Sequence, residues 1–210
     1  MEKPVIIFGA KGLGSVALDI FKANDVIVYG FLDDDKSLHG KEVEEVPIYG
    51  STDDEGFTKL IGQKAEVFVA TDDNKLRKAH VEYILEVRKV MPVNAIHSKA
   101  YIASSALIGH GNLIGNAVVL GTNVKIGNHC ILNTRAIIDY DAELADFVQI
   151  GAGAIINSGV KIEEGAYIGS GAVIVSGVTI GKDAQIGAGS VVIASVPAKA
   201  KMFGNPAAKV

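Results

Sequence analysis

Residues 144–192 read LADFVQ IGAGAI INSGVK IEEGAY IGSGAV IVSGVT IGKDAQ IGAGSV V when they are divided into groups of six. Each group opens with Leu, Ile or Val, and these residue types recur at every sixth position from Ile96 to Val192, seventeen times in all. Four residues after these positions the side chain is small or Val, with Asn112 as the larger polar exception. A period of six fits neither a 3.6-residue helix nor the two-residue alternation of a simple strand.

The period predicts a three-sided parallel β-helix, in which each hexad supplies one short strand and one turn and three hexads complete a coil. Seventeen hexads make about 5.7 coils, so at a strand spacing of ~4.8 Å the prism is roughly 27 Å long. Glycine supplies tight turns after the aliphatic position at residues 109, 115, 121, 127, 151, 169, 181 and 187. The repeat by itself is also compatible with a solenoid that serves only as a spacer.

Composition narrows the classes of function. The 210 residues carry a net charge of -4, without the basic excess that drives binding to nucleic acid. Cys130 is the one cysteine, so no intrachain disulfide can form, and this favours a cytoplasmic location. No apolar stretch reaches the ~20 residues of a bilayer span, and the first residues do not resemble a secretory signal, so we expect no membrane insertion.

The residues before the repeat predict a small doubly wound, Rossmann-like α/β domain, with ligands beyond the carboxyl ends of its strands. We expect strands at 5–8, 26–32 and 66–71 and helices at 15–24 and 75–89. Pro92 breaks the last helix, so we place the boundary near residue 95 and predict domains at 1–95 and 96–210.

The loop after the first strand has the glycine pattern GxxGxG at Gly9, Gly12 and Gly14, not the dinucleotide fingerprint GxGxxG. A nicotinamide cofactor, and with it an oxidoreductase, is therefore only weakly supported. Backbone N–H groups of this loop and the following helix can hold a pyrophosphate, and an acid at Asp33 can accept hydrogen bonds from a ribose or a base. Alternatively, the glycines only permit close packing, and residues 33–35 form a solvated turn.

The chain resembles the NeuD/PglD-type sugar O- or N-acyltransferases of the hexapeptide-repeat superfamily over nearly its whole length. The resemblance rests on the glycine loop 9–14, the GFLDDD segment 30–35, the ATDDNKLR segment 70–77, the IHS segment 96–98 and the tail GNPAAK at 204–209. It implies a left-handed β-helix, a homotrimer with acetyl-CoA between neighbouring prisms, and a nucleotide-linked sugar in the first domain. The implied reaction acetylates a sugar amine or hydroxyl in the synthesis of surface-polysaccharide or glycan precursors.

Carried over residue by residue, the resemblance assigns candidate contacts to both substrates. Those for acetyl-CoA are Ser158, Gly159, Gly187, Ala188 and Gly189, with the tail 199–209 near its nucleotide end. Those for the nucleotide sugar are Gly9, Lys11, Gly12, Leu13, Gly14, Asp33, Asp34, Thr71 and Asn74. The alternative is that the former are ordinary turns and that the tail only caps the prism.

The chain departs from the family at three expected histidines, whose positions hold Leu13, Tyr140 and Gln149. Tyr140 takes the place of the general base, although a phenol with a pKa of ~10 is a poor base near neutral pH. Asp139 or Asp141 could act as the base instead, and the Gln149 amide could donate to a developing oxyanion. We therefore retain two hypotheses: an active acetyltransferase, or a catalytically silent relative that binds a nucleotide sugar or a partner enzyme.

The remaining histidines and the cysteine point to no further chemistry. We expect His110 and His129 to be exposed coil residues and Cys130 to fill a small inward position of the prism. The other three histidines, His39, His80 and His97, have no metal-ligand spacing, so the sequence predicts no metal site.

Overall fold

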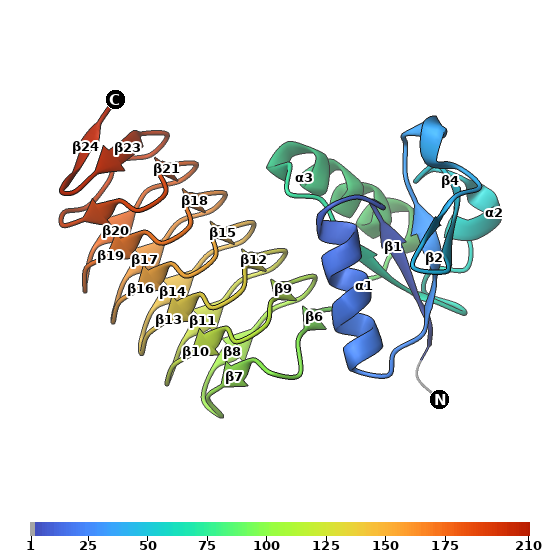
Figure 1. Cartoon of the computed structure of the whole chain (residues 1–210), viewed down its shortest axis with the longest axis horizontal. Helices are drawn as coiled ribbons and strands as arrows, with labels where there is room; N and C mark the ends of the chain where they lie inside the picture. Colours follow the sequence, from blue (N-terminus) through green and yellow to red (C-terminus); the bar gives the residue numbers. More distant parts are fainter. Residues whose placement is uncertain (1–2) are drawn as a thin grey trace. The chain divides into compact units, whose positions relative to one another are not determined.

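The computed structural model describes residues 3–210, which divide into two compact units, one up to Ser98 and one over Lys99–Val210 (Figure 1). The first unit contains a five-stranded sheet in the order β3-β4-β2-β1-β5. Its strands are β1 (Val5–Phe8), β2 (Val28–Leu32), β3 (Glu42–Val43), β4 (Val46–Gly50) and β5 (Glu66–Val69). β1 is parallel to β2 and β5, and β4 extends the parallel sheet beyond β2. This confirms the predicted α/β class.

The helices of the first unit are α1 (Leu13–Ala23), α2 (Glu55–Thr58) and α3 (Asn74–Tyr83), with a 3-10 turn at Lys36–Leu38 and a π-helical turn at Ile84–Arg88. A short strand, β6 (Ala95–Ile96), follows them. α3 begins at a cap in which the Asp73 carboxylate accepts hydrogen bonds from the N–H groups of Lys75 and Leu76. Within residues 3–210 no helix has both the length and the apolar character of a membrane span.

The second unit is a three-sided parallel β-helix built from two-residue strands. They are β7 (Tyr101–Ile102), β8 (Leu107–Ile108), β9 (Leu113–Ile114), β10 (Val119–Leu120), β11 (Lys125–Ile126), β12 (Ile131–Leu132), β13 (Ile137–Ile138), β14 (Glu143–Leu144), β15 (Gln149–Ile150), β16 (Ile155–Ile156), β17 (Lys161–Ile162), β18 (Tyr167–Ile168), β19 (Val173–Ile174), β20 (Thr179–Ile180), β21 (Gln185–Ile186) and β22 (Val191–Val192). Each pairs in parallel with the strand eighteen residues away, as Ile138 does with Ile156, so the predicted coil length is confirmed.

Three sheets form the faces of this prism. The first face is β7-β10-β13-β16-β19-β22, and the second is β8-β11-β14-β17-β20. The third face runs from β9 through β12, β15, β18 and β21 to the closing hairpin β23 (Lys201–Gly204) and β24 (Ala207–Lys209). Figure 1 shows these coils stacked one on the next up to the C-terminus.

The interior of the prism holds the aliphatic and small residues that the repeat places there, and Cys130 is buried among them as predicted. Asn112 is also fully buried, and its amide donates to the Gly127 carbonyl and accepts from the Cys130 N–H. The expectation of an exposed His129 is wrong. Its ring is 4% exposed because it packs on Phe147, at 5.0 Å between ring centres.

Candidate functional site

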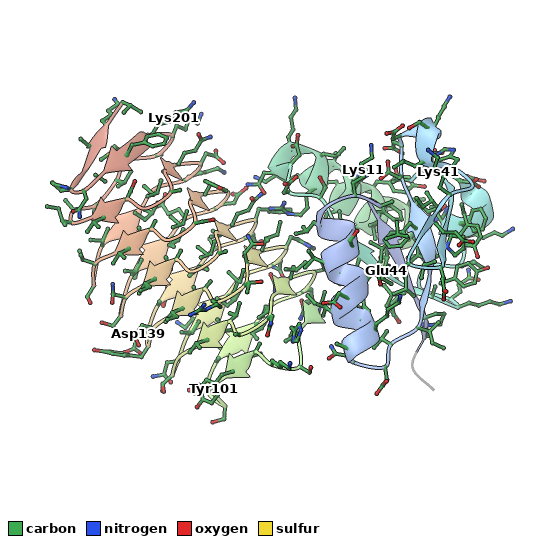
Figure 2. The ribbon with its side chains drawn as sticks, viewed as in Figure 1. Lys11, Lys41, Glu44, Tyr101, Asp139 and Lys201 are labelled. Atoms are coloured by element: carbon green, nitrogen blue, oxygen red, sulfur yellow. The ribbon has the colours of Figure 1, made fainter. Side chains whose placement is uncertain are left out.

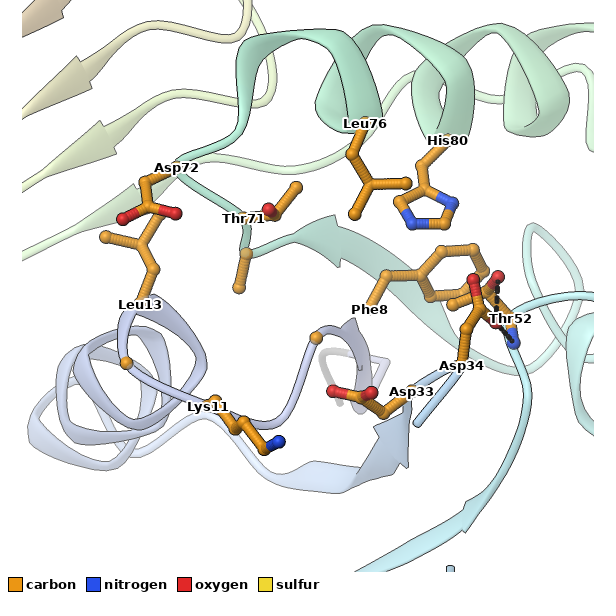
Figure 3. A pocket seen from close by; sticks show the side chains of 13 residues that line it. Phe8, Lys11, Leu13, Asp33, Asp34, Thr52, Thr71, Asp72, Leu76 and His80 are labelled. Carbon is orange, nitrogen blue, oxygen red and sulfur yellow. Dashed lines mark hydrogen bonds between the residues drawn. The ribbon is translucent and has the colours of Figure 1, made fainter. Parts of the chain in front are cut away.

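A cavity of about 370 Å³ opens beside the carboxyl ends of β1, β2 and β5 (Figure 3). This is the edge of a parallel sheet at which ligands usually bind. It is lined by Phe8, Gly9, Lys11, Gly12, Leu13, Asp33, Asp34, Thr52, Ala70, Thr71, Asp72, Leu76 and His80. Seven of the nine residues predicted to contact a nucleotide sugar are therefore brought together here, whereas Gly14 and Asn74 lie outside the lining.

The three glycines of the loop have different physical roles. A Cβ at Gly9 would lie 2.6 Å from the Ala70 carbonyl oxygen, and one at Gly14 would collide with the Gly9 carbonyl. These two glycines are therefore needed for close packing between the loop, the helix and β5. A Cβ at Gly12 would meet nothing within 4 Å, so only this glycine leaves open space at the cavity.

Two acids at the end of β2 fix the cavity wall. The Asp33 carboxylate accepts hydrogen bonds from the Ala10 N–H at 2.8 Å and the Asp35 N–H at 2.9 Å. One oxygen of Asp34 accepts from both the N–H and the hydroxyl of Thr52, as the dashed lines in Figure 3 show. These bonds hold both carboxylates in place before any ligand arrives.

The cationic group at the rim is already paired. Lys11 Nζ lies 2.6 Å from an Asp35 carboxylate oxygen. The ion pair raises the pKa of Lys11 and holds the pKa of Asp35 well below its usual range. Both side chains are exposed, so an incoming anion can compete with Asp35 for the ammonium.

His80 lines the cavity, a role that differs from the metal ligation for which its spacing was considered. It lies four residues after Leu76 on α3, and both side chains point from the helix into the cavity (Figure 3). Burial lowers the pKa of His80, against the opposing effect of Asp34 and Asp33, and its ring meets Phe8 edge-on at 5.7 Å. The i, i+4 spacing on the predicted helix was the signal available in the sequence.

Arg77 explains why Asn74 does not face the cavity. The Arg77 guanidinium is buried, donating to the Thr71 carbonyl at 2.7 Å and to the Asn74 side-chain oxygen. It thereby fixes the turn that presents Thr71 to the cavity.

On the prism, the turns between the first and second faces form what we call the tyrosine edge (residues 121–124, 139–142, 157–160 and 175–178). Tyr140 is 52% exposed, and its N–H donates to the Asp139 carboxylate at 2.8 Å. Asp141 adopts a left-handed conformation, with φ of 58°, and accepts from the Asn123 amide at 3.0 Å. Figure 2 labels Asp139 at the outside of the prism.

The next coil places two predicted acetyl-CoA contacts directly beside this turn. The Gly159 N–H donates to the Tyr140 carbonyl at 3.0 Å, and the Ser158 hydroxyl donates to Ser176 at 3.1 Å. A Cβ at Gly159 would meet nothing within 4 Å, so there is open space at this position next to Tyr140. One edge thus carries Tyr140, Asp139, Asp141, Ser158 and Gly159.

The other predicted contacts lie elsewhere on the prism. The turns between the third and first faces form what we call the glycine edge (residues 115–118, 133–136, 151–154, 169–172 and 187–190), which contains Gly187, Ala188 and Gly189. A side chain at Gly187 would collide with the Phe203 ring of β23, whereas Gly189 faces open space. Gln149, 7% exposed, lies on the third face next to this edge, so a single chain does not bring it beside Tyr140.

Comparison with known proteins decides the family. The PglD N-terminal domain model matches residues 4–84, and the bacterial transferase hexapeptide (six repeats) model matches residues 141–176 and 159–194. A structure of a perosamine N-acetyltransferase variant from Caulobacter crescentus, in complex with CoA and GDP-perosamine, is 30% identical with a TM-score of 0.91. The match covers 100% of this chain and 98% of that chain. The chain belongs to the left-handed β-helix sugar acetyltransferases.

Two further structures of this type match the full length of the chain. The acetyltransferase domain of PglB from Neisseria gonorrhoeae, in complex with acetyl coenzyme A, is 26% identical with a TM-score of 0.91, and the match covers 100% of both chains. WeeI from Acinetobacter baumannii is 28% identical with a TM-score of 0.88, and the match covers 99% of both chains. No curated protein sequence matches the chain. These findings confirm the predicted acyltransferase family and its left-handed β-helix.

Proposed function

We propose that this left-handed β-helix acetyltransferase transfers the acetyl group of acetyl-CoA to a nucleotide-linked sugar, in the cytoplasmic synthesis of a glycan precursor. The observation that carries the proposal is the match along the entire chain to an enzyme solved with both CoA and a GDP-linked amino sugar. The same two-part architecture is present here, with a cavity in the α/β unit and a β-helix.

The nucleotide sugar is proposed to bind in the cavity of the α/β unit. The open surface at Gly12 and the start of α1 suit a diphosphate, because backbone N–H groups and the helix dipole favour negative charge there. Lys11 can exchange its bond to Asp35 for one to a phosphate oxygen. The polar groups of Asp34, Thr71 and His80 remain for the ribose and base.

A homotrimer is proposed because only the first face presents an apolar outer surface along its length. Its outward side chains are Val119, Ile137, Ile155, Val173 and Val191. The second face presents instead a charged column in which Lys125 forms an ion pair with Glu143 and Lys161 follows in register. Burying the apolar face against two further copies removes it from water.

In such a ring the glycine edge of one copy lies opposite the tyrosine edge of the next, and acetyl-CoA is proposed to lie between them. The open positions at Gly159, Gly171 and Gly189 leave space for the slender pantetheine arm. Gln149 of the partner subunit would then approach the turn at Tyr140.

The proposed chemistry is direct transfer. The sugar amine or hydroxyl attacks the thioester carbonyl, a C–N or C–O bond forms, and the C–S bond breaks. The Gln149 amide donates to the developing oxyanion. Tyr140, flanked by Asp139 and Asp141, acts as the phenolate and receives the proton from the attacking group. The resulting phenol passes that proton to the CoA thiolate, which restores the phenolate.

A second candidate is a silent relative that binds a nucleotide sugar or a partner enzyme without turnover. It is favoured by the phenol of Tyr140 and the amide of Gln149, which stand where the family resemblance implies imidazoles. The two candidates differ in whether a thiol is released.

A thiol-release assay with acetyl-CoA and a panel of 4-amino nucleotide sugars distinguishes them. We expect release of CoA that depends on one of the acceptors and is lost in Tyr140→Phe. Binding of CoA without release on any acceptor would support the silent relative and contradict the proposal.

A further inference from the structure

Between residues 115 and 190, the charged residues along the two edges of the first face are confined to a single coil, and Lys99 occupies the position equivalent to Arg135 two coils earlier. In the turns of the glycine edge, between residues 115 and 190, the charged residue is Arg135. In the turns of the tyrosine edge, between residues 121 and 178, the charged residues are Asp139 and Asp141. All three belong to the coil that contains Tyr140. Arg135 and Asp141 are six residues apart, so their offset along the prism is about a third of the ~4.8 Å coil spacing.

Arg135 has a fixed backbone and a side chain that makes no ion pair within the described part of its own chain. Its turn adopts a left-handed φ of 62°, and its N–H donates to the Asn116 carbonyl at 2.9 Å. The exposed side chain borders a shallow hollow of about 550 Å³ on the first face, beside Val119, Ile137 and Ile155. Among residues 3–210 no carboxylate lies within ion-pair distance of its guanidinium.

We propose that Arg135 of the partner subunit completes the site in each copy, with its guanidinium beside the Asp139–Tyr140–Asp141 turn. This inference rests on the proposed acetyltransferase trimer. In a closed ring every interface joins unlike edges, so the pairing of Arg135 with the two carboxylates recurs at each interface. An interface between two tyrosine edges would instead bring four carboxylates together. Charge therefore favours the head-to-tail arrangement over the alternative.

The pairing has a consequence for the proposed base. The turn at Tyr140 carries the two flanking carboxylates, and the neighbouring coils contact it through uncharged groups, namely the Asn123 amide and the backbones of Thr122 and Gly159. The two carboxylates would repel negative charge that develops on the phenol oxygen. A guanidinium beside the turn offsets this repulsion. Arg135 is thus a positioning residue that acts through Tyr140.

Cross-linking tests the juxtaposition without relying on activity. We expect the double variant Arg135→Cys/Asp139→Cys to give covalent dimers and trimers on a denaturing gel after treatment with a short bis-maleimide. Cys130 does not interfere, because it is buried inside the prism. The matched control Arg135→Cys/Lys161→Cys, with its second thiol on the charged second face, should remain monomeric. A monomeric Arg135→Cys/Asp139→Cys protein, or cross-linking of Arg135→Cys alone, would overturn the proposal.

Subunit mixing tests the function of the pair. Arg135→Glu and Tyr140→Phe should each lose activity as homotrimers. When the two chains are refolded together in equal amounts, a quarter of the interfaces join an intact turn to an intact Arg135. We therefore expect about one quarter of wild-type activity to return. No recovery would mean that both residues act within one chain, which contradicts the proposal.

A pH profile separates the proposed role from a merely structural one. Arg135→Ala should move the ascending limb of kcat, which follows deprotonation of the base, to higher pH, and an unchanged limb would argue against any action through Tyr140. If the wild-type protein transfers no acetyl group, the proposed function fails, whereas the cross-linking result still reports the interface.

Discussion

A substitution at Tyr140 tests the proposed general base most directly. Tyr140→His should raise the rate of acceptor-dependent CoA release near pH 7, because an imidazole has a pKa of about 6.5 and a phenol one of about 10. The ascending limb of the pH–rate profile, which follows deprotonation of the base, should move to lower pH by several units. The pH–rate profile of the two proteins measures both effects, with Tyr140→Phe as the inactive control. An unchanged rate and limb would place the base elsewhere, at Asp139 or Asp141.

His80 makes the unfolding free energy of the chain depend on pH. Burial lowers its pKa in the folded state, so the unfolded chain binds a proton more readily. Stability from this group is complete above the unfolded pKa of about 6.5 and is lost as the pH falls below it. His80→Gln should therefore lose less stability between pH 7.5 and pH 5.5 than the wild-type chain. Urea unfolding at the two pH values measures the difference, and equal losses would contradict it.

For single residues, the sequence predicts which of them line the cavity better than it predicts what each of them does there. Asp33, Lys11 and Thr71 could be assigned to the cavity because they follow the ends of predicted strands. The roles of Gly9 and Gly14 could not be assigned, since only the coordinates show that a Cβ there would meet backbone carbonyls. The position of Asn74 outside the cavity lining could not be predicted for a similar reason: its partner, the buried Arg77, is visible only once α3 is formed.

The strands of the prism are stabilised by columns of identical positions. Ile156 is fully buried between Ile138 and Ile174 of the adjoining coils. Ile156→Ala should cost about 2–5 kcal/mol of unfolding free energy, since the aligned backbone cannot collapse into the space. Lys161→Ala, exposed on the next strand, should change it by less than about 0.5 kcal/mol. Denaturant unfolding measures both, and equal effects would refute the inward assignment.

Strands and helices were predicted best where the hydrophobic period of the sequence is strongest. The period of six located the strands of the prism because each error in register would bury a polar residue or expose an aliphatic one. Residues 36–65 carry no such period, and β3, β4 and α2 were not predicted. The last helix was predicted to run to Lys89 in one piece, whereas it changes to a π-helical turn and ends at that left-handed residue.

The oligomeric state of the whole molecule is predicted by the side chains on the three outer faces of the prism. An apolar first face, with Arg135 at one edge and Asp139 and Asp141 at the other, predicts a trimeric mass by light scattering. Ile155→Glu should shift it towards the monomer, because a carboxylate cannot be buried unpaired at the interface. Lys161→Glu on the second face is the control and should remain trimeric. A monomeric wild-type protein at micromolar concentration would contradict this assembly.

A sequence read as a single chain cannot show which of its residues meet across copies. Tyr140 and Gln149 both occupy positions where the family resemblance implies histidines, yet they lie on different parts of one prism. Their proposed cooperation depends on the assembly, as does that of Arg135. The family and the fold could be predicted from the repeat and the glycine loop, whereas the composition of the site depends on the interface.

The most direct measurement is the fate of a labelled acetyl group. The protein is incubated with acetyl-CoA carrying an isotopic label in the acetyl carbons and with a nucleotide-linked 4-amino sugar, and the products are separated and weighed by mass spectrometry. We predict that the label is found on the amino sugar, in equal amount to the CoA thiol released. Label that remains on CoA, or that is recovered only as free acetate, would contradict acetyl transfer by this chain.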